Sequence, residues 1–423
     1  MTATQLPLDT DWSINELLTL KYVGTRFQPI ISMREKIVVG LEALSFGTHP
    51  RTGQRIPPGM LFESAAAEGA LLDLDRLCRE KALESFSRLA RRSELLLWLN
   101  IETSILKPEV VGTGWLAETV RRNGLRPDHV VIEIVESAVS DLAALQSFVD
   151  RHKAMGFLIA LDDVGTGHSS LERIARIKPD IIKIDRFLVR GLEKEYHKRE
   201  VVRSLADLAR GIGALVVAEG VETEDEALSI LDLGINIHQG YLYAHPDQTP
   251  SDQVNRCTRA MDHLAENFRH RRVSRFERRK TWFATMGETV RALAYDLVPL
   301  KQTELGTALE TLILDRPDIE CLYVLDMDGI QVTETVCNEL CLSRPTSLLF
   351  RPAPKGADLS LKDYFLLVKA GLPQYFSEPY ISRASGNICI TVSFPFTTVD
   401  RTPYILCADY HLDSSILDGD RAF

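Results

Sequence analysis

Long apolar runs are missing from this sequence, and no stretch approaches the ~18 consecutive apolar residues that are needed to span a bilayer. Residues 1–20 also lack the basic start and the long apolar core of a signal peptide. We therefore expect a cytoplasmic protein without a membrane span.

Cysteine is scarce and scattered, with seven residues in a chain of 423. There is no CxxC pair, and Cys337 and Cys341 have no second pair nearby that would complete a zinc site. We expect these cysteines to be buried or free thiols in a reducing compartment.

Positive charge is in deficit, because 49 Lys and Arg residues face 59 Asp and Glu residues and the formal net charge is -10. A sequence-independent nucleic-acid binder usually carries a basic face, so this balance argues against that class. It leaves open a small anionic ligand that is held through metal ions. The basic residues between 269 and 280 are interpreted as a solvated or acid-pairing helix face, and a DNA-binding regulator would depend on them alone.

What the sequence does contain, from about residue 26 to 245, is a repeated alternation of short apolar runs with longer segments of helical spacing. Strands buried on both faces that alternate with helices indicate a parallel sheet. Eight of them predict an irregular (β/α)8 TIM-type barrel of the α/β class. The first two are separated only by residues 33–36, too few for a crossover helix, so we expect an antiparallel first strand. The predicted strands are 27–32, 37–44, 95–100, 130–135, 158–162, 181–185, 215–219 and 236–239.

The barrel is predicted to end near Pro246 and Pro250. In the following segment, apolar residues step by three and four between 254 and 268 and again between 283 and 297. This heptad seam, broken in the middle, predicts a long helix and a homodimer. The rest should form an α+β domain with strands at 320–325, 330–335, 379–382, 388–394 and 404–409 and a helix near 361–369. The predicted domains are an N-terminal segment (1–21), the barrel (22–250), a helical linker (251–299) and the C-terminal domain (300–423).

Polar residues end the predicted barrel strands. The apolar run 157–161 is followed directly by Asp162 and Asp163 and then by a glycine-bracketed loop. A buried strand gains nothing from ending in paired charges, so a cation at this point is the natural explanation; a simple loop cap is the alternative. Similar endings recur around the barrel at Glu42, Asn100, Glu133, Lys183, Glu219 and Gln239.

The residue types at these strand ends indicate a particular chemistry. They offer hard oxygen ligands without a histidine or thiolate, which favours Mg²⁺ or Mn²⁺ over zinc. Carboxylates that bridge two such cations would orient a phosphate ester and activate water for in-line attack.

The motifs resemble those of a known family. Glu42-Ala43-Leu44 is similar to the signature tripeptide of the EAL family, the phosphodiesterases that hydrolyse cyclic di-GMP. The resemblance covers about residues 22–250 and implies the irregular barrel with an antiparallel first strand. Its further motifs are Gln28-Pro29-Ile30, Asn100, Glu133 to Ser137, Asp162 to Gly167, Lys183 to Arg186, Glu219 to Thr223 and Gln239 to Leu242.

The resemblance also implies roles for individual residues. It makes Glu42, Asn100, Glu133, Asp162 and Asp163 the ligands of one or two Mg²⁺ or Mn²⁺ ions. It also implies that Glu42, Lys183 and Glu219 are the catalytic residues. Lys183 would hold the catalytic water, and Glu219 would be the general base. Gln28, Leu44 and Gln239 are implied to bind substrate, with Gln239 closing the metal site. Loop support is implied for Glu136, Gly165, Thr166, Gly167 and Glu222, of which Glu136 and Glu222 have a purely scaffolding role as the alternative.

Asp162 and Asp163 would point in opposite directions on a regular strand. We therefore expect the backbone to turn into the glycine loop at this point, because the second carboxylate can reach a metal only in that way.

The sequence departs from the family pattern directly after Leu44. Active members usually continue with Leu-Arg, and that arginine contacts a substrate phosphate, whereas this chain has Ser45-Phe46. One lost charge-assisted contact is worth roughly 1.5–3 kcal/mol. His168 and Val164 replace the usual tyrosine and phenylalanine. Two hypotheses follow: a metal-dependent phosphodiesterase that opens cyclic di-GMP to linear 5'-pGpG, or a receptor that binds cyclic di-GMP without useful turnover.

The C-terminal domain resembles the PAS-like or Cache-like sensory domain that follows some EAL domains. The stretches 376–382 and 388–396 carry this likeness. The resemblance implies regulation of the barrel by this domain, and a small-molecule ligand of unknown identity is an accompanying expectation. Arg351, Tyr364 or Arg383 would line its pocket, with surface or core roles as the alternative.

Overall fold

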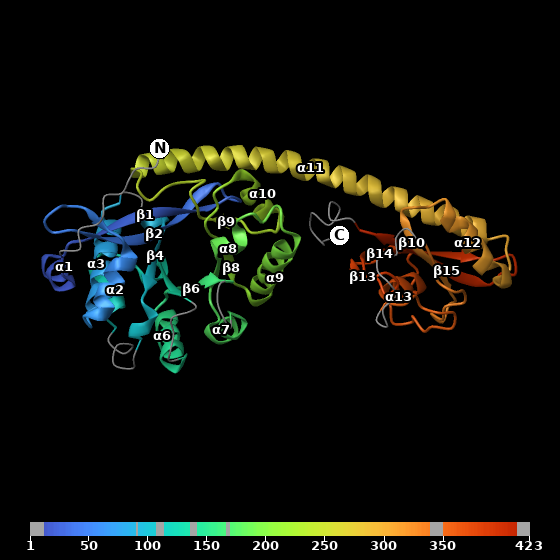
Figure 1. Ribbon diagram of the computed structural model, residues 1–423, viewed down its shortest axis with the longest axis horizontal. Helices are drawn as coiled ribbons and strands as arrows, with labels where there is room; N and C mark the ends of the chain where they lie inside the picture. The colour runs from blue at the N-terminus through green and yellow to red at the C-terminus, as the bar shows by residue number, and fades with distance from the viewer. Residues whose placement is uncertain are drawn as a thin grey trace. The chain divides into compact units, whose positions relative to one another are not determined.

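The structure, a computed structural model, describes residues 12–89, 92–106, 114–135, 142–165, 170–338 and 350–412. The chain divides into two units, Met1–Arg269 and His270–Phe423, and the boundary falls within helix α11 (Pro250–Leu297) (Figure 1). In the described part of the chain, no helix is both long and apolar enough to cross a membrane.

The first unit is built on a closed barrel of eight strands, as predicted (Figure 1). The strands follow the order β1-β9-β8-β7-β6-β5-β4-β2, and pairing of β2 with β1 closes the barrel. β1 is antiparallel to both neighbours, and the remaining pairs of the barrel are parallel. The sequence did not reveal β3, which extends the sheet beyond β2. The strands are β1 (Val23–Ser32), β2 (Ile37–Thr48), β3 (Arg55–Ile56), β4 (Leu96–Ile101), β5 (Val130–Val135), β6 (Leu158–Val164), β7 (Ile181–Ile184), β8 (Leu215–Ala218) and β9 (Ile237–His238).

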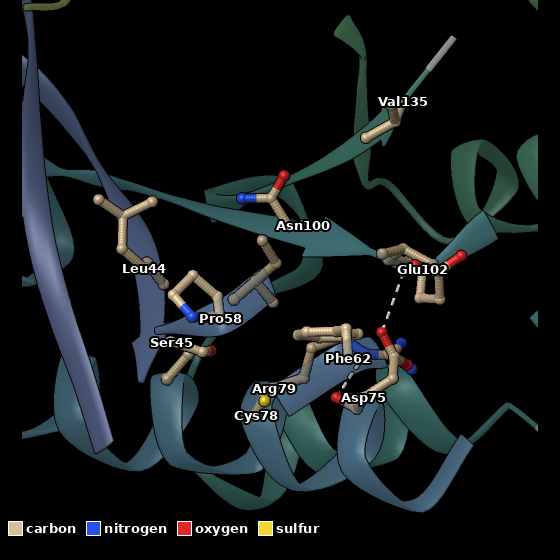
Figure 2. Close-up of a pocket in the computed structure, with 14 residues that line it drawn as sticks. Leu44, Ser45, Pro58, Phe62, Asp75, Cys78, Arg79, Asn100, Glu102 and Val135 are labelled. Carbon is tan, nitrogen blue, oxygen red and sulfur yellow. Dashed lines mark hydrogen bonds and ion pairs between the residues drawn. The ribbon is translucent and has the colours of Figure 1, made fainter. Parts of the chain in front are cut away.

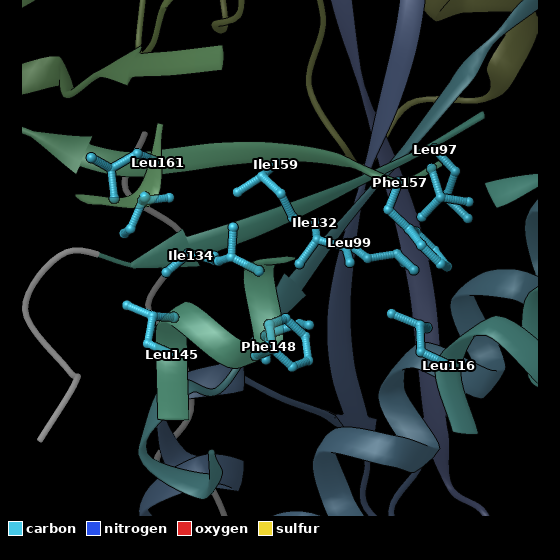
Figure 3. Close-up of a cluster of buried hydrophobic side chains, with 14 of the residues drawn as sticks. Leu97, Leu99, Leu116, Ile132, Ile134, Leu145, Phe148, Phe157, Ile159 and Leu161 are labelled. Atoms are coloured by element: carbon cyan, nitrogen blue, oxygen red, sulfur yellow. The ribbon is translucent and has the colours of Figure 1, made fainter. Parts of the chain in front are cut away.

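Helices cover the outside of the barrel and bury its apolar side chains. Figure 3 shows strand residues such as Leu99, Ile132 and Ile159 pointing toward Phe148 and Leu116 of two covering helices. Each such side chain contributes roughly 1.5–3 kcal/mol when fully buried, so this layer holds the strand ends in fixed positions. Among the described residues, the α-helices of this unit are α1 (Ile14–Leu20), α2 (Pro58–Ala67), α3 (Leu71–Ser87), α5 (Trp115–Arg122), α6 (Leu142–Ala154), α7 (Ser170–Ile177), α8 (Arg186–Val189), α9 (Tyr196–Ile212) and α10 (Glu224–Asp232).

Strand β6 is irregular at the paired aspartates. Its register against β7 shifts between Leu161 and Val164, and Asp163 has a φ of 56°, in the left-handed region. The expected backbone turn therefore occurs, but as a bulge inside the strand, because Val164 resumes the pairing before the glycine loop begins. A bulge of this kind re-aims side chains that a regular strand would place on opposite faces.

The predicted heptad seam of α11 is buried within the chain. Cys257, Met261 and Leu264 pack into an apolar cluster of the barrel unit, and Met286, Val290, Leu293 and Leu297 belong to the core of the second unit. Val254, the first residue of the seam, is 52% exposed. The seam therefore gives no independent support to a dimer, since most of its apolar residues are already covered by their own units.

The second unit contains an antiparallel sheet in the order β11-β10-β15-β14-β12, with β13 paired to β14. The α+β prediction is thus confirmed in outline. The predicted strand 330–335 was wrong, because only isolated bridges form at Ile330 and Gln331. The elements are α12 (Leu305–Leu314), β10 (Ile319–Leu325), β11 (Val336–Cys337), α13 (Asp363–Lys369), β12 (Tyr375–Phe376), β13 (Tyr380–Ile381), β14 (Ile388–Thr397) and β15 (Pro403–His411).

Two cysteines correct the expectation of free thiols. Cys321 of β10 and Cys337 of β11 form a disulfide, because antiparallel pairing places them directly opposite each other with their Cα atoms 4.1 Å apart. Their separation of 16 residues carried no recognisable motif. Cys78, Cys257, Cys389 and Cys407 are buried free thiols, as expected, and Cys341 lies outside the described residues.

Candidate active site

The barrel brings the predicted strand-end residues together. They lie on or directly after eight successive strands, and all except Asn100, Asp163 and Glu219 are buried. The positions are Gln28 on β1, Glu42 on β2, Asn100 on β4, Glu133 on β5, Asp162 and Asp163 on β6, Lys183 on β7, Glu219 after β8 and Gln239 after β9.

Lys183 is the centre of this cluster. Its side chain is 1% exposed, and its Nζ lies 2.5 Å from Oε1 of Glu219, 2.7 Å from Oε1 of Glu133 and 3.2 Å from Oδ1 of Asp162. Oε2 of Glu42 is 3.9 Å away. Burial alone would lower the pKa of Lys183, but the surrounding carboxylates raise it well above its usual value. Lys183 is therefore a fixed cation.

Glu42 is oriented by two amide side chains from neighbouring strands. Asn100 Nδ2 donates to Oε1 of Glu42 at 2.8 Å, and Gln239 Nε2 donates to Oε2 at 2.5 Å. Gln239 also donates to Oε1 of Gln28 at 3.2 Å. Burial raises the pKa of Glu42, but Lys183 and these hydrogen bonds outweigh it and hold the pKa below the usual value. Glu42 is thus kept ionised.

Two other carboxyl groups have raised pKa values. Burial, with the charge of Glu42 next in importance, raises the pKa of Glu133 well above its usual range. Glu219 is only partly exposed, and its desolvation likewise raises its pKa to about 8, although Lys183 opposes the effect. A carboxylate with such a pKa can accept a proton near neutral pH, which is the property required of a general base.

The bulge in β6 creates a group of converging oxygens. One carboxylate oxygen each from Asp162, Asp163 and Glu219 lies within 4.8 Å of the others. Glu133 adds a fully buried carboxylate, and neither of its oxygens accepts a directed hydrogen bond from a described residue. Four carboxyl groups share one cation, Lys183, and buried charge is costly unless enough positive charge pairs with it. These oxygens therefore fit hard divalent cations.

A pocket of about 260 Å³ adjoins the carboxylate cluster. Asn100, which donates to Glu42, lines this pocket together with Leu44, Pro58 and Phe62 (Figure 2). The pocket and the cluster thus share a residue. A ligand could place one part in this apolar space and an anionic group beside the carboxylates.

Sequence reasoning missed the ion pair that supports this pocket. Arg79 and Asp75, four residues apart on α3, form a buried salt bridge, and Oδ1 of Asp75 accepts a hydrogen bond from the backbone N of Glu102 at 3.1 Å (Figure 2). The pair fixes the end of β4, which carries Asn100. The i, i+4 spacing was the available signal.

The structure describes two of the five residues that were predicted to support loops. Glu136, Thr166 and Gly167 lie outside the described residues. Gly165 has a φ of 110°, and a Cβ there would overlap Leu188, so a glycine is required. The side chain of Glu222 is exposed, while its backbone N is held by Oε2 of Glu226 at 3.0 Å. Glu226, which the sequence did not single out, therefore anchors this loop.

Fold and site together define a TIM-type barrel whose acidic mouth is suited to divalent cations and an anionic ligand. The model of the EAL domain matches residues 13–246, more than half of the chain. The chain therefore belongs to the EAL domain family.

Its relatives include the cyclic di-GMP phosphodiesterase RocR of Pseudomonas aeruginosa, 29% identical over 52% of this chain and 56% of that protein. The probable cyclic di-GMP phosphodiesterase PdeN of Escherichia coli is 30% identical over 52% of this chain and 42% of that protein. The match spans less than two thirds of the length of each relative. Among solved structures, YkuI of Bacillus subtilis, an EAL-domain protein in complex with its substrate c-di-GMP and calcium, has a TM-score of 0.75. It is 22% identical, and the match covers 95% of this chain and all of that chain, which shows a shared fold.

Proposed function

We propose that this chain hydrolyses cyclic di-GMP to linear 5'-pGpG with the help of one or two divalent cations, Mg²⁺ or Mn²⁺. The observation that carries the proposal is the convergence of Glu42, Glu133, Asp162, Asp163 and Glu219 around Lys183 at the mouth of an EAL barrel. Relatives that are named cyclic di-GMP phosphodiesterases, and a fold shared with a structure that contains c-di-GMP and calcium, support it.

The residues would divide the work as follows. Glu42, Asn100, Glu133, Asp162 and Asp163 would hold the cations, which when bound polarise the phosphodiester and acidify water.

Lys183 would hold the attacking water through Nζ, and Glu219 would accept its proton. Attack by the water oxygen at phosphorus opens the ring, and the leaving oxygen takes up a proton to give the linear product. Gln28, Leu44 and Gln239 would position the substrate.

A receptor that binds cyclic di-GMP without useful turnover is the second candidate. Phe46, at the position where active family members carry a phosphate-binding arginine, is the feature that favours it. Both candidates use the same ligand and the same carboxylate cluster, so binding alone does not separate them.

The parts outside the barrel complete the proposal. We propose an N-terminal segment (1–21), the barrel domain (22–250), a helical linker (251–299) and a C-terminal domain (300–423). The C-terminal domain would be a PAS-like or Cache-like sensory domain that regulates the barrel, with a ligand still to be identified. A homodimer and a cytoplasmic location also stay predictions.

One experiment separates the two candidates. Purified protein is incubated with cyclic di-GMP and Mg²⁺ or Mn²⁺, and the linear dinucleotide is measured by chromatography. Formation of 5'-pGpG supports the phosphodiesterase. Measurable binding without product would contradict it and support the receptor.

A further inference from the structure

A pair of arginines lies against Phe46, the residue that departs from the family pattern. The guanidinium carbons of Arg26 and Arg55 are each 5.1 Å from the centre of the Phe46 ring. Both guanidinium groups contact one carboxylate oxygen, Oδ1 of Asp247, with Arg55 at 3.2 Å. Two positive charges thus share one negative charge, which leaves an excess of one positive charge.

The strand register places this arginine pair beside the carboxylate cluster. In the β1–β2 hairpin, Gln28 pairs with Glu42 and Arg26 pairs with Leu44, without a register shift between them. Residues two apart on a strand face the same side, so Arg26 lies on the same face as Gln28 and Glu42. The rise between the two rungs is about 7 Å. Leu44, the partner of Arg26, lines the pocket next to the cluster.

Arg26 has a guanidinium group that could bind an additional anion. Its side chain is only 19% exposed, and its Nη2 is buried without an acceptor in the described part of the chain. Its partner Asp247 is 64% exposed and lies on the loop after β9. The Phe46 ring covers Gly24, where a Cβ would overlap it, so the ring is a fixed platform for the guanidinium. Arginine binds phosphate oxygens in a bidentate fork that suits this arrangement.

We propose that Arg26 binds the phosphodiester group of cyclic di-GMP that is not being cleaved, and that Asp247 is the carboxylate it releases when the ligand enters. The inference rests on the function proposed above, since it requires one phosphodiester of the ring at the carboxylate cluster. The second phosphodiester then faces the Arg26–Leu44 pair, which is the next pair of the hairpin on the same face as Gln28 and Glu42. Phe46 thereby takes part in anion binding indirectly, by supporting the guanidinium of another residue.

The test compares ligand affinity in the full-length chain, measured by isothermal titration calorimetry with cyclic di-GMP in Ca²⁺. We expect Arg26→Gln to raise Kd by about 10- to 100-fold, the range for one lost charge-assisted bond. The Kd of Arg26→Lys should lie between those of the wild-type chain and Arg26→Gln, because lysine keeps the charge but not the bidentate fork. Asp247→Asn should bind as tightly as the wild-type chain or more tightly, because it removes the competing carboxylate. Where turnover is measured, Arg26→Gln should raise KM and leave kcat nearly unchanged, since this contact is uniform between ground and transition states.

Arg210→Gln is the matched control, because Arg210 is a 67% exposed arginine in the last turn of α9, at the opposite end of the barrel from the strand ends. Wild-type binding with an unchanged Kd in Arg26→Gln would overturn the role of Arg26 and leave the proposed function standing. No binding by the wild-type chain would instead overturn the proposed function itself. If Arg26→Gln does not fold, Asp247→Asn decides: a Kd raised tenfold or more would show that the ion pair is structural and would contradict the inference.

Discussion

Each unit of the chain buries a group of carboxylates, and the two groups are compensated differently. In the barrel, Glu133 is fully buried beside Lys183, and its oxygens accept no directed hydrogen bond from the described residues. In the sheet of the second unit, Oδ1 of Asp409 accepts hydrogen bonds from Thr391 Oγ1 at 2.7 Å, Tyr380 Oη at 3.3 Å and Tyr323 Oη at 3.4 Å. Glu133 thus depends on the charge of Lys183, whereas Asp409 is supplied with neutral hydroxyl donors.

This difference distinguishes a site from a structural network. Hydroxyl donors satisfy a carboxylate without attracting a further ligand, and burial raises the pKa of Asp409 to about 7, so that a proton can complete the compensation. In the barrel, four carboxyl groups share one lysine, and such an excess of acidic groups attracts cations. The two groups should therefore respond in opposite ways to mutation, pH and metal ions.

The largest expected effect is on turnover. Glu42→Ala should lower it by about a thousandfold or more, because a lost ligand at a divalent-cation site forfeits several kcal/mol of charge stabilisation. Glu320→Gln, which neutralises a buried carboxyl group of the second unit, is the control and should retain turnover. The measurement is the rate of 5'-pGpG formation in Mn²⁺. Survival of activity in Glu42→Ala would refute the assignment of the metal site.

The next effect concerns the stability of the barrel. Lys183→Met should lower the free energy of unfolding by about 3–5 kcal/mol, because it leaves buried carboxylates without their cation. Lys36→Met is the control, since that lysine pairs with Asp262 at the surface and its loss should cost about 1 kcal/mol or less. Urea denaturation measures both. Mn²⁺ should restore stability to Lys183→Met, and equal losses in the two variants would contradict the central role of Lys183.

Asp409 should make the second unit less stable as the pH rises. Its pKa is raised to about 7 in the folded chain, above the value of about 3.9 in an unfolded one. Its contribution to the free energy of unfolding is therefore full below about pH 4 and is lost as the pH rises through about 7, amounting to a few kcal/mol. Asp409→Asn should flatten this dependence in denaturation curves recorded between pH 4 and 8. A variant with the wild-type slope would show that other groups cause it.

The smallest expected effect is that of metal ions on the stability of the two units. Mn²⁺ at about 100 times its Kd should stabilise the barrel unit by ~2.7 kcal/mol, seen as a higher midpoint in thermal unfolding. The second unit should not respond, because among the described residues the converging carboxylate oxygens lie in the barrel unit. Asp163→Asn should reduce the shift, since Asp163 contributes an oxygen to the converging group. Stabilisation of both units alike would indicate non-specific binding.

The sequence predicted most of the fold and which side chains lie at the ends of the barrel strands. Apolar runs that end in polar residues identified all eight barrel strands, because residues buried on both faces of a strand cannot be polar until the strand reaches the mouth. The prediction failed where a contact joins distant segments. The disulfide between Cys321 and Cys337 depends on strand register, and the contacts that bury most of the α11 seam depend on how each unit folds.

By itself, then, the sequence determined which side chains reach the mouth of the barrel, since local alternation fixes where each strand ends. Only the tertiary structure decided how they meet there. The bulge at Asp163 brings oxygens of Asp162 and Asp163 together with one of Glu219. The pairing of β1 with β2 places Arg26 opposite Leu44, two residues along the strand from Glu42 and on the same face. Both depend on backbone pairing between strands, which the order of residues in a single strand does not contain.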